Sequence, residues 1–534
     1  MKPSTTPTGL QPLSPQHQSP WIEAGPKTNP YHPLNENLET DVVIIGGGLA
    51  GVTTAYCLSQ SGKKVVLVED GIIGSGETSH TTAQLVTALD DRYAHFEKLF
   101  GEEDTRLIAQ SHKAAIDFVE QTIHQEKIDC LFDRVPGYLF CHPSDREDIL
   151  KDELSAAQKA GIHPIYLNQI PGMLNDEEAC LEFPRQAQFH PLLYLHGLCE
   201  VIVEKGGQLF TNTHAAIINA DGIISEDGFI VKADHVVVAT NSPVNNLVAM
   251  HLKQTAFRTY VVAGLVQKNA LPRALWWDTG DHDADQDFPP YHYVRLTPYN
   301  DEYELLISGG EDHPTGDLGP GETAEENRYQ KLEAWTRDRF PLEDILYRWS
   351  GQVLEPVDSL AFIGRNTLDK NNVYIITGDS GTGMTHCTIG GMLIRDLIMG
   401  IKNPWEEIYR PSRITMNSSL VFFKELIRGI KSVLQGTPDD ESVKEVQQIK
   451  EGEAKICKID GHKCGVYHDL DGDLQIVSAR CTHLGATLHW NADEKSWDCP
   501  WHGSRFTSQG TVLNGPANSN LPFYEVSATA SKTD

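Results

Sequence analysis

Residues 41–69 read DVVIIGGGLAGVTTAYCLSQSGKKVVLVE. The apolar run before the glycines predicts a buried parallel strand, the segment after them predicts a helix, and VVLV predicts a second strand. In the G-x-G-x-x-G spacing, Gly46 allows a tight turn, Gly48 lets the backbone approach a pyrophosphate, and Gly51 allows close packing of helix on strand. Glu69 ends the second strand, where a carboxylate accepts hydrogen bonds from a ribose hydroxyl. The stretch therefore predicts an α/β, Rossmann-type dinucleotide-binding fold.

A second motif lies near the other end of the chain, where residues 481–485 read CTHLG and residues 499–504 read CPWHGS. Two cysteines and two histidines could hold a tetrahedral zinc, but in zinc fingers a pair of cysteines usually precedes a pair of histidines. Here each loop carries one Cys and one His. That pattern suits a [2Fe–2S] cluster with two thiolates on one iron and two imidazoles on the other, the Rieske arrangement. The candidate cluster ligands are Cys481, His483, Cys499 and His502.

On this motif, the C-terminal part of the chain resembles Rieske domains. Relatives in respiratory complexes carry an extra cysteine in each loop and join the two by a disulfide, whereas Ala486 and Trp501 occupy those positions here. The resemblance therefore implies no need for an oxidising compartment. Ser504 keeps a hydroxyl that bonds a cluster sulfide in those relatives, but Phe506 replaces a tyrosine. The lost donor implies a lower reduction potential.

Motifs between these two ends resemble D-amino-acid oxidase-like flavoenzymes. The loop GSGETSHTTA at residues 74–83, which includes Thr81 and Thr82, resembles the segment that passes the flavin pyrophosphate. VYIITGDSGTGMT at residues 373–385 resembles the closing strand, turn and helix, whose helix N-terminus points at the isoalloxazine and stabilises negative charge on it. The resemblance implies that the dinucleotide is FAD. It also implies flavin contacts from Gly381, Thr382, Gly383, Met384 and Thr385.

Candidate substrate contacts lie between the flavin motifs. In amino-acid oxidases an Arg and a Tyr commonly clamp the substrate carboxylate, the Arg through paired hydrogen bonds. Tyr293 and Arg295 alternate on one predicted strand and could share a face. Arg258 and Tyr260 have the same spacing, and Tyr260 is the next candidate. The structural alternative is a salt bridge beside a packed aromatic ring.

Composition limits the class of protein. The 534 residues are 40% hydrophobic and 22% charged, as in a soluble multidomain protein. The formal net charge of −30 argues against nucleic acid or an anionic membrane as a partner. No secretory signal and no run of apolar residues long enough to span a membrane is visible, so we expect a cytoplasmic protein. Two of the ten cysteines are predicted cluster ligands, and the other eight show no metal spacing.

The motifs divide the chain into four regions. Residues 1–40 form an extended lead-in, residues 41–400 form the FAD-dependent oxidoreductase, residues 401–440 form a linker, and residues 441–534 form a small all-β Rieske domain. Within the oxidoreductase, we expect an FAD domain built from residues 41–88, 190–250 and 346–400. An inserted α+β substrate domain would then comprise residues 89–189 and 251–345. In the linker, residues 420–434 have the apolar spacing of an amphipathic helix.

The resembled branch oxidises amines and amino acids and includes the D-amino-acid, sarcosine, glycine and γ-glutamylputrescine oxidases. The chain as a whole resembles bacterial FAD-dependent oxidoreductases that end in a Rieske domain. This implies hydride transfer from a small amine or amino acid to FAD, with single electrons passed through the cluster to an external acceptor. The alternative is an NAD(P)H- or ferredoxin-linked electron-transfer protein in which the cluster feeds or drains the flavin.

Two observations bear on the alternatives. An NAD(P)H-linked reductase needs a second dinucleotide motif, and Gly309–Gly310 and Gly390–Gly391 lack the flanking strand, helix and acid. A Rieske oxygenase needs a mononuclear iron site, and no D/E-x-x-H-x₄-H pattern occurs. The substrate, the acceptor or donor protein, the direction of electron flow and the oligomeric state stay open.

Overall fold

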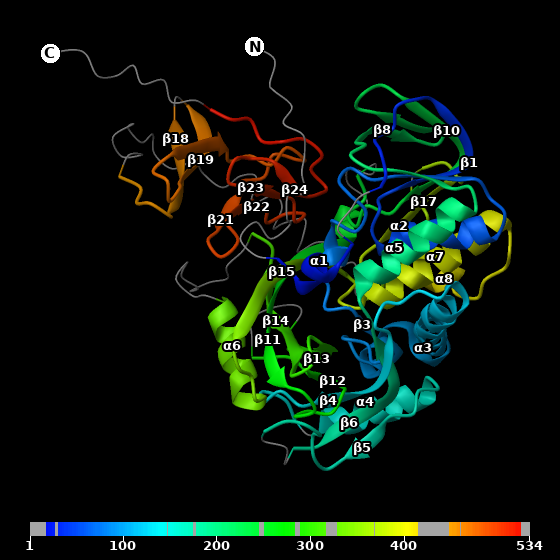
Figure 1. The fold of residues 1–534 in the computed structure, drawn as a ribbon, viewed down its shortest axis with the longest axis vertical. Helices are drawn as coiled ribbons and strands as arrows, with labels where there is room; N and C mark the ends of the chain where they lie inside the picture. Colours follow the sequence, from blue (N-terminus) through cyan, green and yellow to red (C-terminus); the bar gives the residue numbers. More distant parts are fainter. Residues whose placement is uncertain are drawn as a thin grey trace.

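The computed structural model describes residues 18–26, 30–146, 148–174, 178–244, 250–283, 289–316, 328–367, 369–414, 448–459 and 461–524. Two large sheets with their helices make up the body, and a small all-β domain lies beside them at the C-terminal end (Figure 1). The predicted fold class is thus confirmed. The helix predicted over residues 420–434 lies outside the described residues.

The first sheet carries the dinucleotide motif. Its eight strands have the main order β16-β17-β10-β1-β2-β7, with the β8–β9 hairpin beside β10. The strands are β1 (Leu38–Ile45), β2 (Val65–Val68), β7 (Gln208–Phe210), β8 (Ala215–Asn219), β9 (Gly222–Ser225), β10 (Ile230–Val238), β16 (Phe362–Arg365) and β17 (Val373–Thr377). From β17 to β7 the pairs are parallel. Strands β2 and β17 are buried along their whole length, because helices cover this sheet.

A layer of helices packs on this sheet. Helix α2 (Leu49–Gln60) packs against both α5 (Pro191–Glu204) and α7 (Gly383–Met399), and α3 (Tyr93–Glu126) packs against α7 (Figure 1). Helix α3 is interrupted at Gly101, where φ is 80°. The short helices are α1 (Pro20–Ala24), η1 (Glu77–Ser79), η2 (His251–Lys253) and α8 (Glu406–Tyr409). The N-termini of α2 and α7 lie at the same edge of the sheet, beyond the carboxyl ends of β1 and β17.

The second sheet has nine strands in the main order β15-β11-β14-β13-β12-β4-β6-β3, with β5 beside β6. They are β3 (Gln84–Leu85), β4 (Asp133–Phe140), β5 (Ile165–Leu167), β6 (Cys180–Gln188), β11 (Gln254–Gln267), β12 (Leu275–Asp278), β13 (Tyr293–Pro298), β14 (Tyr303–Pro314) and β15 (Ile345–Pro356). Helices α4 (Asp148–Lys159) and α6 (Arg328–Arg339) accompany it. Strand β15 pairs with β11 along its length, so residues 346–356 belong to this sheet, although the sequence grouped them with the FAD domain.

The C-terminal domain consists of a three-stranded and a four-stranded antiparallel sheet. The first contains β18 (Ala454–Ile459), β19 (His462–His468) and β20 (Leu474–Ser478). The second contains β21 (His489–Asn491), β22 (Ser496–Asp498), β23 (Arg505–Thr507) and β24 (Val512–Asn514). Trp497 and Phe506 are fully buried in its core. Over the whole described part of the chain, we find no helix with the length and apolar character needed to cross a membrane.

Candidate functional site

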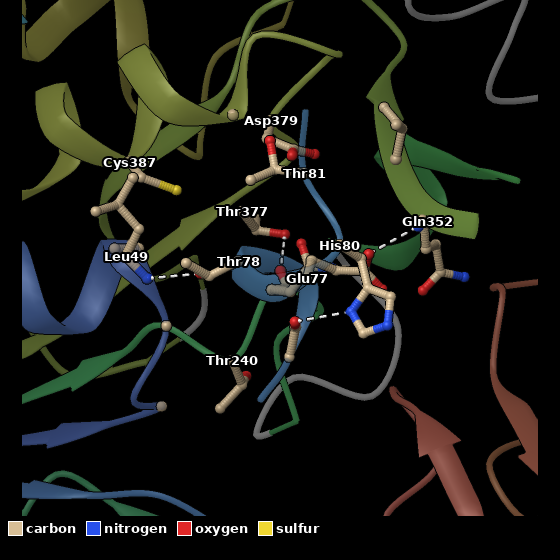
Figure 2. A pocket seen from close by; sticks show the side chains of 18 of the residues that line it. Leu49, Glu77, Thr78, His80, Thr81, Thr240, Gln352, Thr377, Asp379 and Cys387 are labelled. Atoms are coloured by element: carbon tan, nitrogen blue, oxygen red, sulfur yellow. Dashed lines mark hydrogen bonds between the residues drawn. The ribbon is translucent and has the colours of Figure 1, made fainter. Parts of the chain in front are cut away.

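A cavity of about 810 Å³ lies at the carboxyl edge of the first sheet. Its walls come from three parts of the chain: the loops after the strands of the first sheet, the facing surface of the second sheet, and the segment that follows β23 in the C-terminal domain. Figure 2 shows Leu49 and Thr78 on one side of it, Gln352 on another, Asp379 in the turn before α7 and Cys387 in the first part of that helix. Parallel α/β sheets bind dinucleotides at this edge.

The three motif glycines occupy positions with different packing. A Cβ on Gly51 would lie 1.9 Å from the Gly46 oxygen, and a Cβ on Gly46 would lie 2.4 Å from the Ala239 oxygen. A Cβ on Gly48 would meet only the Thr78 hydroxyl, at 3.3 Å, and Gly48 lines the cavity. Gly46 and Gly51 thus hold the turn against its neighbours, whereas Gly48 leaves space for a ligand. The geometry fits a pyrophosphate at the N-terminus of α2.

Glu69 lines the same cavity, and its carboxylate binds the backbone amides of two turns. Its Oε2 accepts a hydrogen bond from the Gly47 amide at 2.5 Å, and its Oε1 accepts one from the Gly71 amide at 2.9 Å. Burial raises the pKa of this carboxyl, and the two amides oppose that shift. The contact of Glu69 with a ribose stays a prediction.

The predicted flavin-contact residues mostly line the cavity. Thr81, Thr82 and the turn Gly381–Met384 do so. Thr385 does not line it: its hydroxyl donates to the Thr382 oxygen at 3.0 Å and lies 2.8 Å from His112 Nδ1. Gly381 has a φ of +68°, and a Cβ there would lie 2.0 Å from Asp90 Oδ2. This turn therefore packs closely against the half-buried carboxylate of Asp90.

The three predicted substrate residues lie in different places. Tyr293 lines the cavity, and its hydroxyl is 2.8 Å from Thr259 Oγ1. Arg295 is buried beside the cavity, where its Nη1 donates to the oxygens of Thr82 and Ala83, both at 2.8 Å. Tyr260 lies at the boundary with the C-terminal domain, with its hydroxyl 3.4 Å from Asn491 Nδ2. Neither Arg295 nor Tyr260 is among the lining residues.

Apart from Glu69, the carboxylates of the cavity are the feature that sequence reasoning missed. The Tyr291 hydroxyl donates to Asp90 Oδ2 at 2.6 Å, and Thr259 bonds both Tyr293 and Asp312. Burial raises the pKa of Asp90 to about 7 and that of Asp312 to about 7. The acidic side chains that line the cavity are Glu69, Asp70, Glu77, Asp90, Glu226, Asp312, Glu355 and Asp379. None of the described lining residues is Lys or Arg.

The sequence offered a weak signal for two of these acids. Asp90 follows directly after the threonine loop and its apolar strand, and Asp312 follows the Gly309–Gly310 pair. The ring of Tyr293 packs directly on this glycine pair, since a Cβ on Gly309 would lie 2.2 Å from it. Its role is therefore to seat an aromatic side chain.

The two cysteine–histidine loops form matching turns. The Gly485 amide donates to the Cys481 oxygen at 2.9 Å, and the Gly503 amide donates to the Cys499 oxygen at 3.1 Å. The two glycines have φ values of 79° and 77°. The Cys481 and Cys499 thiols lie close enough to shift each other's pKa, that of Cys481 downward and that of Cys499 upward.

The four predicted cluster ligands form two pairs, one of cysteines and one of histidines. The ring centroids of His483 and His502 are 5.1 Å apart, and the two thiols are near enough to influence each other's pKa. In the described residues no three His, Cys, Asp or Glu side chains surround the position of a single ion. A pair of thiolates and a pair of imidazoles fits a [2Fe–2S] cluster, in which each iron takes one pair. The Ser504 hydroxyl, beside the thiols, accepts a hydrogen bond from the Ala517 amide at 3.0 Å.

The histidine edge of these loops faces the body of the protein. His251 of η2 lies with its ring centroid 5.1 Å from that of His483 and 5.6 Å from that of His502. His502 is only 5% exposed. Gln352 of β15 donates from Nε2 to the Gly503 oxygen at 2.7 Å, and Gln352 also lines the cavity. One side chain therefore contacts both the cavity and a predicted cluster loop.

Comparisons with known proteins agree with this architecture. The family described as FAD dependent oxidoreductase matches residues 41–397, and the Rieske [2Fe-2S] domain matches residues 441–525. The chain is 32% identical to the putative Rieske 2Fe-2S iron-sulfur protein YhfW of Bacillus subtilis (strain 168), over 91% of this chain and 93% of that protein. It is 24% identical to γ-glutamylputrescine oxidoreductase of Escherichia coli (strain K12), over 72% and 90% of the two chains.

Solved structures share the fold of the body. Glycine oxidase from Geobacillus kaustophilus superposes with a TM-score of 0.57 at 17% identity, over 71% of this chain and all of that one. L-proline dehydrogenase from P. horikoshii gives a TM-score of 0.55 at 21% identity, over 71% and 98%. The FAD dependent oxidoreductase family binds FAD, and the Rieske domain family binds a [2Fe–2S] cluster. The chain belongs to the FAD-dependent oxidoreductase family and continues, at its C-terminal end, into a Rieske [2Fe–2S] domain.

Proposed function

We propose that this protein oxidises a small amine at FAD and exchanges the electrons, one at a time, through its Rieske cluster with an external acceptor. The observation that carries the proposal is the position of the cluster loops. Gln352 lines the flavin cavity and donates to Gly503, which follows the cluster ligand His502. This contact supports a short path between the flavin site and the cluster site in one chain.

The lining of the cavity supports an amine substrate. Binding a substrate carboxylate usually calls for a cationic side chain, and none of the described lining residues is Lys or Arg. The substrate side instead presents Asp90 and Asp312, together with the aromatic side chains of Trp277, Tyr291 and Tyr293. Carboxylates and aromatic faces both attract ammonium groups. We therefore favour an amine without a neighbouring free carboxylate over an α-amino acid.

The residues of the chain account for binding and proton control. FAD, when bound, supplies the hydride acceptor, and the cluster, when bound, exchanges single electrons. Asp90, whose pKa burial raises to about 7, is placed to hold the substrate ammonium and to take its proton, which frees the amine for oxidation. Tyr291 fixes the orientation of Asp90 through its 2.6 Å hydrogen bond. The N-terminus of α7 favours negative charge at the adjoining part of the cavity.

The test is anaerobic stopped-flow mixing with a panel of amines, amino acids and NAD(P)H. We expect simple amines to bleach the flavin band first and the cluster band second. Asp90→Asn should raise the amine concentration needed by about 10- to 100-fold, since a hydrogen bond to a charged group is worth about 1.5–3 kcal/mol. Asp301→Asn, in the exposed turn before β14, is the matched control. Flavin reduction by NAD(P)H alone, with no response to amines, would favour the electron-transfer alternative.

A further inference from the structure

The Rieske domain supplies part of the cavity wall. Residues 511–520 follow β23, and most of them line the same cavity as the glycine motif. The Rieske residues in the wall are Thr511, Val512, Leu513, Gly515, Ala517, Asn518, Ser519 and Asn520. A whole segment facing the cavity suggests an additional role.

The wall lies over the dinucleotide side of the cavity. A Cβ on Gly515 would lie 3.8 Å from Val244 Cγ1 and 4.0 Å from Ser242 Cβ, in the loop after β10. Asn514 donates from Nδ2 to Glu77 Oε1 at 2.8 Å. Glu77 is the residue before Thr78, whose hydroxyl accepts a 3.0 Å hydrogen bond from the Leu49 amide at the start of α2. These are the elements on which the pyrophosphate of a dinucleotide rests.

Glu77 is the shared residue of this junction. Its Oε1 accepts a hydrogen bond from the side chain of Asn514 in the Rieske domain. Its Oε2 accepts one from the backbone amide of Gln352 in β15, at 2.8 Å. Figure 2 shows Glu77 between Gln352 and the loop that carries Thr78. The sequence separation of Glu77 and Asn514 is 437 residues, so only docking of the two domains brings them together.

Both cluster loops are tied to the same wall. Asn514 Oδ1 accepts from Arg505 Nη1 at 3.2 Å, and Arg505 Nε donates at 3.1 Å to Asp498, the residue before Cys499. From the other loop, the Thr482 hydroxyl donates to the Ser519 oxygen at 2.6 Å. The wall is therefore built on the same scaffold as the cluster ligands.

We propose that the Rieske domain is a structural part of the FAD site: residues 511–520 close over the dinucleotide, so that FAD binding and domain docking stabilise each other. By thermodynamic linkage, a contact that favours the docked domain also tightens FAD binding, and bound FAD favours docking to the same extent. A wall over the dinucleotide also obstructs its exit, so we expect the tighter binding to appear as slower FAD release. This role does not depend on the identity of the substrate. It assigns to the C-terminal domain a function in cofactor retention besides electron transfer.

The experiment measures FAD release from the holoenzyme. Free FAD is trapped by an excess of an apo-flavoprotein, and the change in flavin fluorescence gives the release rate. Asn514→Ala removes the contact with Glu77 and should accelerate release about tenfold. Gln475→Ala removes a hydrogen bond to Asp469 within the same domain and should leave the rate unchanged. Equal rates for wild type and Asn514→Ala would overturn the proposal.

A second measurement covers the possibility that Asn514→Ala disturbs the Rieske fold. Hydrogen exchange of wild-type holoenzyme is compared with that of FAD-depleted protein, each with its cluster spectrum recorded. We expect amides of residues 511–520 to exchange at least several-fold more slowly when FAD is bound, with the strands β18–β20 unaffected. No FAD-dependent protection of this segment would refute the linkage. Neither measurement requires turnover, so a failure of the amine-oxidation proposal would leave these results interpretable.

Discussion

Gly503 and Gly485 form a matched pair for testing how the two domains dock. Each lies in a cysteine–histidine loop just after the predicted ligand histidine, and their φ values of 77° and 79° are nearly equal. A Cβ on Gly485 would meet nothing within 4 Å, whereas a Cβ on Gly503 would lie 2.2 Å from Ala256 Cβ and 2.6 Å from Gln352 Nε2. Alanine at the two positions therefore imposes the same backbone strain but a clash at only one of them.

The magnitude follows from these distances. The left-handed backbone costs an L-residue about 1–2 kcal/mol in either variant. Non-bonded carbons prefer a separation of about 3.5–4.0 Å, so the methyl group of Gly503→Ala forces the domains apart at this point. Overpacking costs about 1–3 kcal/mol, and loss of the Gln352 hydrogen bond adds about 1 kcal/mol. The docking equilibrium should weaken by about 2–4 kcal/mol, a factor of about 30 to 700.

The assay is intramolecular electron transfer after flash photoreduction of the flavin. The decay of the reduced flavin and the bleaching of the cluster band give the same rate constant when electrons pass between the two centres. We expect Gly485→Ala to transfer electrons at nearly the wild-type rate and Gly503→Ala to be markedly slower. The cluster EPR signal should be present in both, which confirms that the ligand loops are intact. Equal transfer rates in the two variants would falsify the proposed docking through the histidine edge.

Three further predictions concern the separate centres. Burial raises the pKa of Asp90 to about 7, so this carboxyl is neutral below pH 7 and anionic above it. The KM for a cationic amine should therefore fall as the pH rises from about 6 to about 8, and Asp90→Asn should flatten this part of the pH profile. Gly51→Ala places a Cβ 1.9 Å from the Gly46 oxygen and should abolish FAD binding, whereas Gly62→Ala, with open space around it, should keep full flavin content after gel filtration. His502→Cys should retain iron but lower the cluster potential in a redox titration, because a thiolate adds negative charge.

Two residues near the predicted cluster ligands bear on the reduction potential of the cluster. The Ser504 hydroxyl accepts from the Ala517 amide, which leaves its own hydrogen available to a cluster sulfur. Phe506 is fully buried in the domain core and offers no donor. The lower reduction potential expected from Phe506 in place of tyrosine stays a prediction. Phe506→Tyr is the variant that tests it, because it restores the hydroxyl donor.

The sequence by itself determined both cofactor motifs. Gly46, Gly48 and Gly51 were recognisable because a strand, a turn and a helix start within a few residues, so the steric requirement is local. The predicted cluster ligands rest on the same kind of signal: each loop supplies one Cys and one His within four residues, for instance Cys499 and His502. Local geometry of this kind is fixed by covalent spacing and needs no knowledge of the rest of the fold.

Only the tertiary structure brought together the substrate side of the cavity and the junction between the domains. Asp90 and Tyr291 are 201 residues apart, and Glu77 and Asn514 are 437 apart. Their contacts depend on the order of strands in the second sheet and on how the Rieske domain docks, which residue spacing does not encode. Arg295 illustrates the limit: its strand position suggested a carboxylate clamp, but its guanidinium binds backbone oxygens next to the cavity. Burial of an arginine is stable only where such acceptors converge, and that convergence is a property of the folded chain.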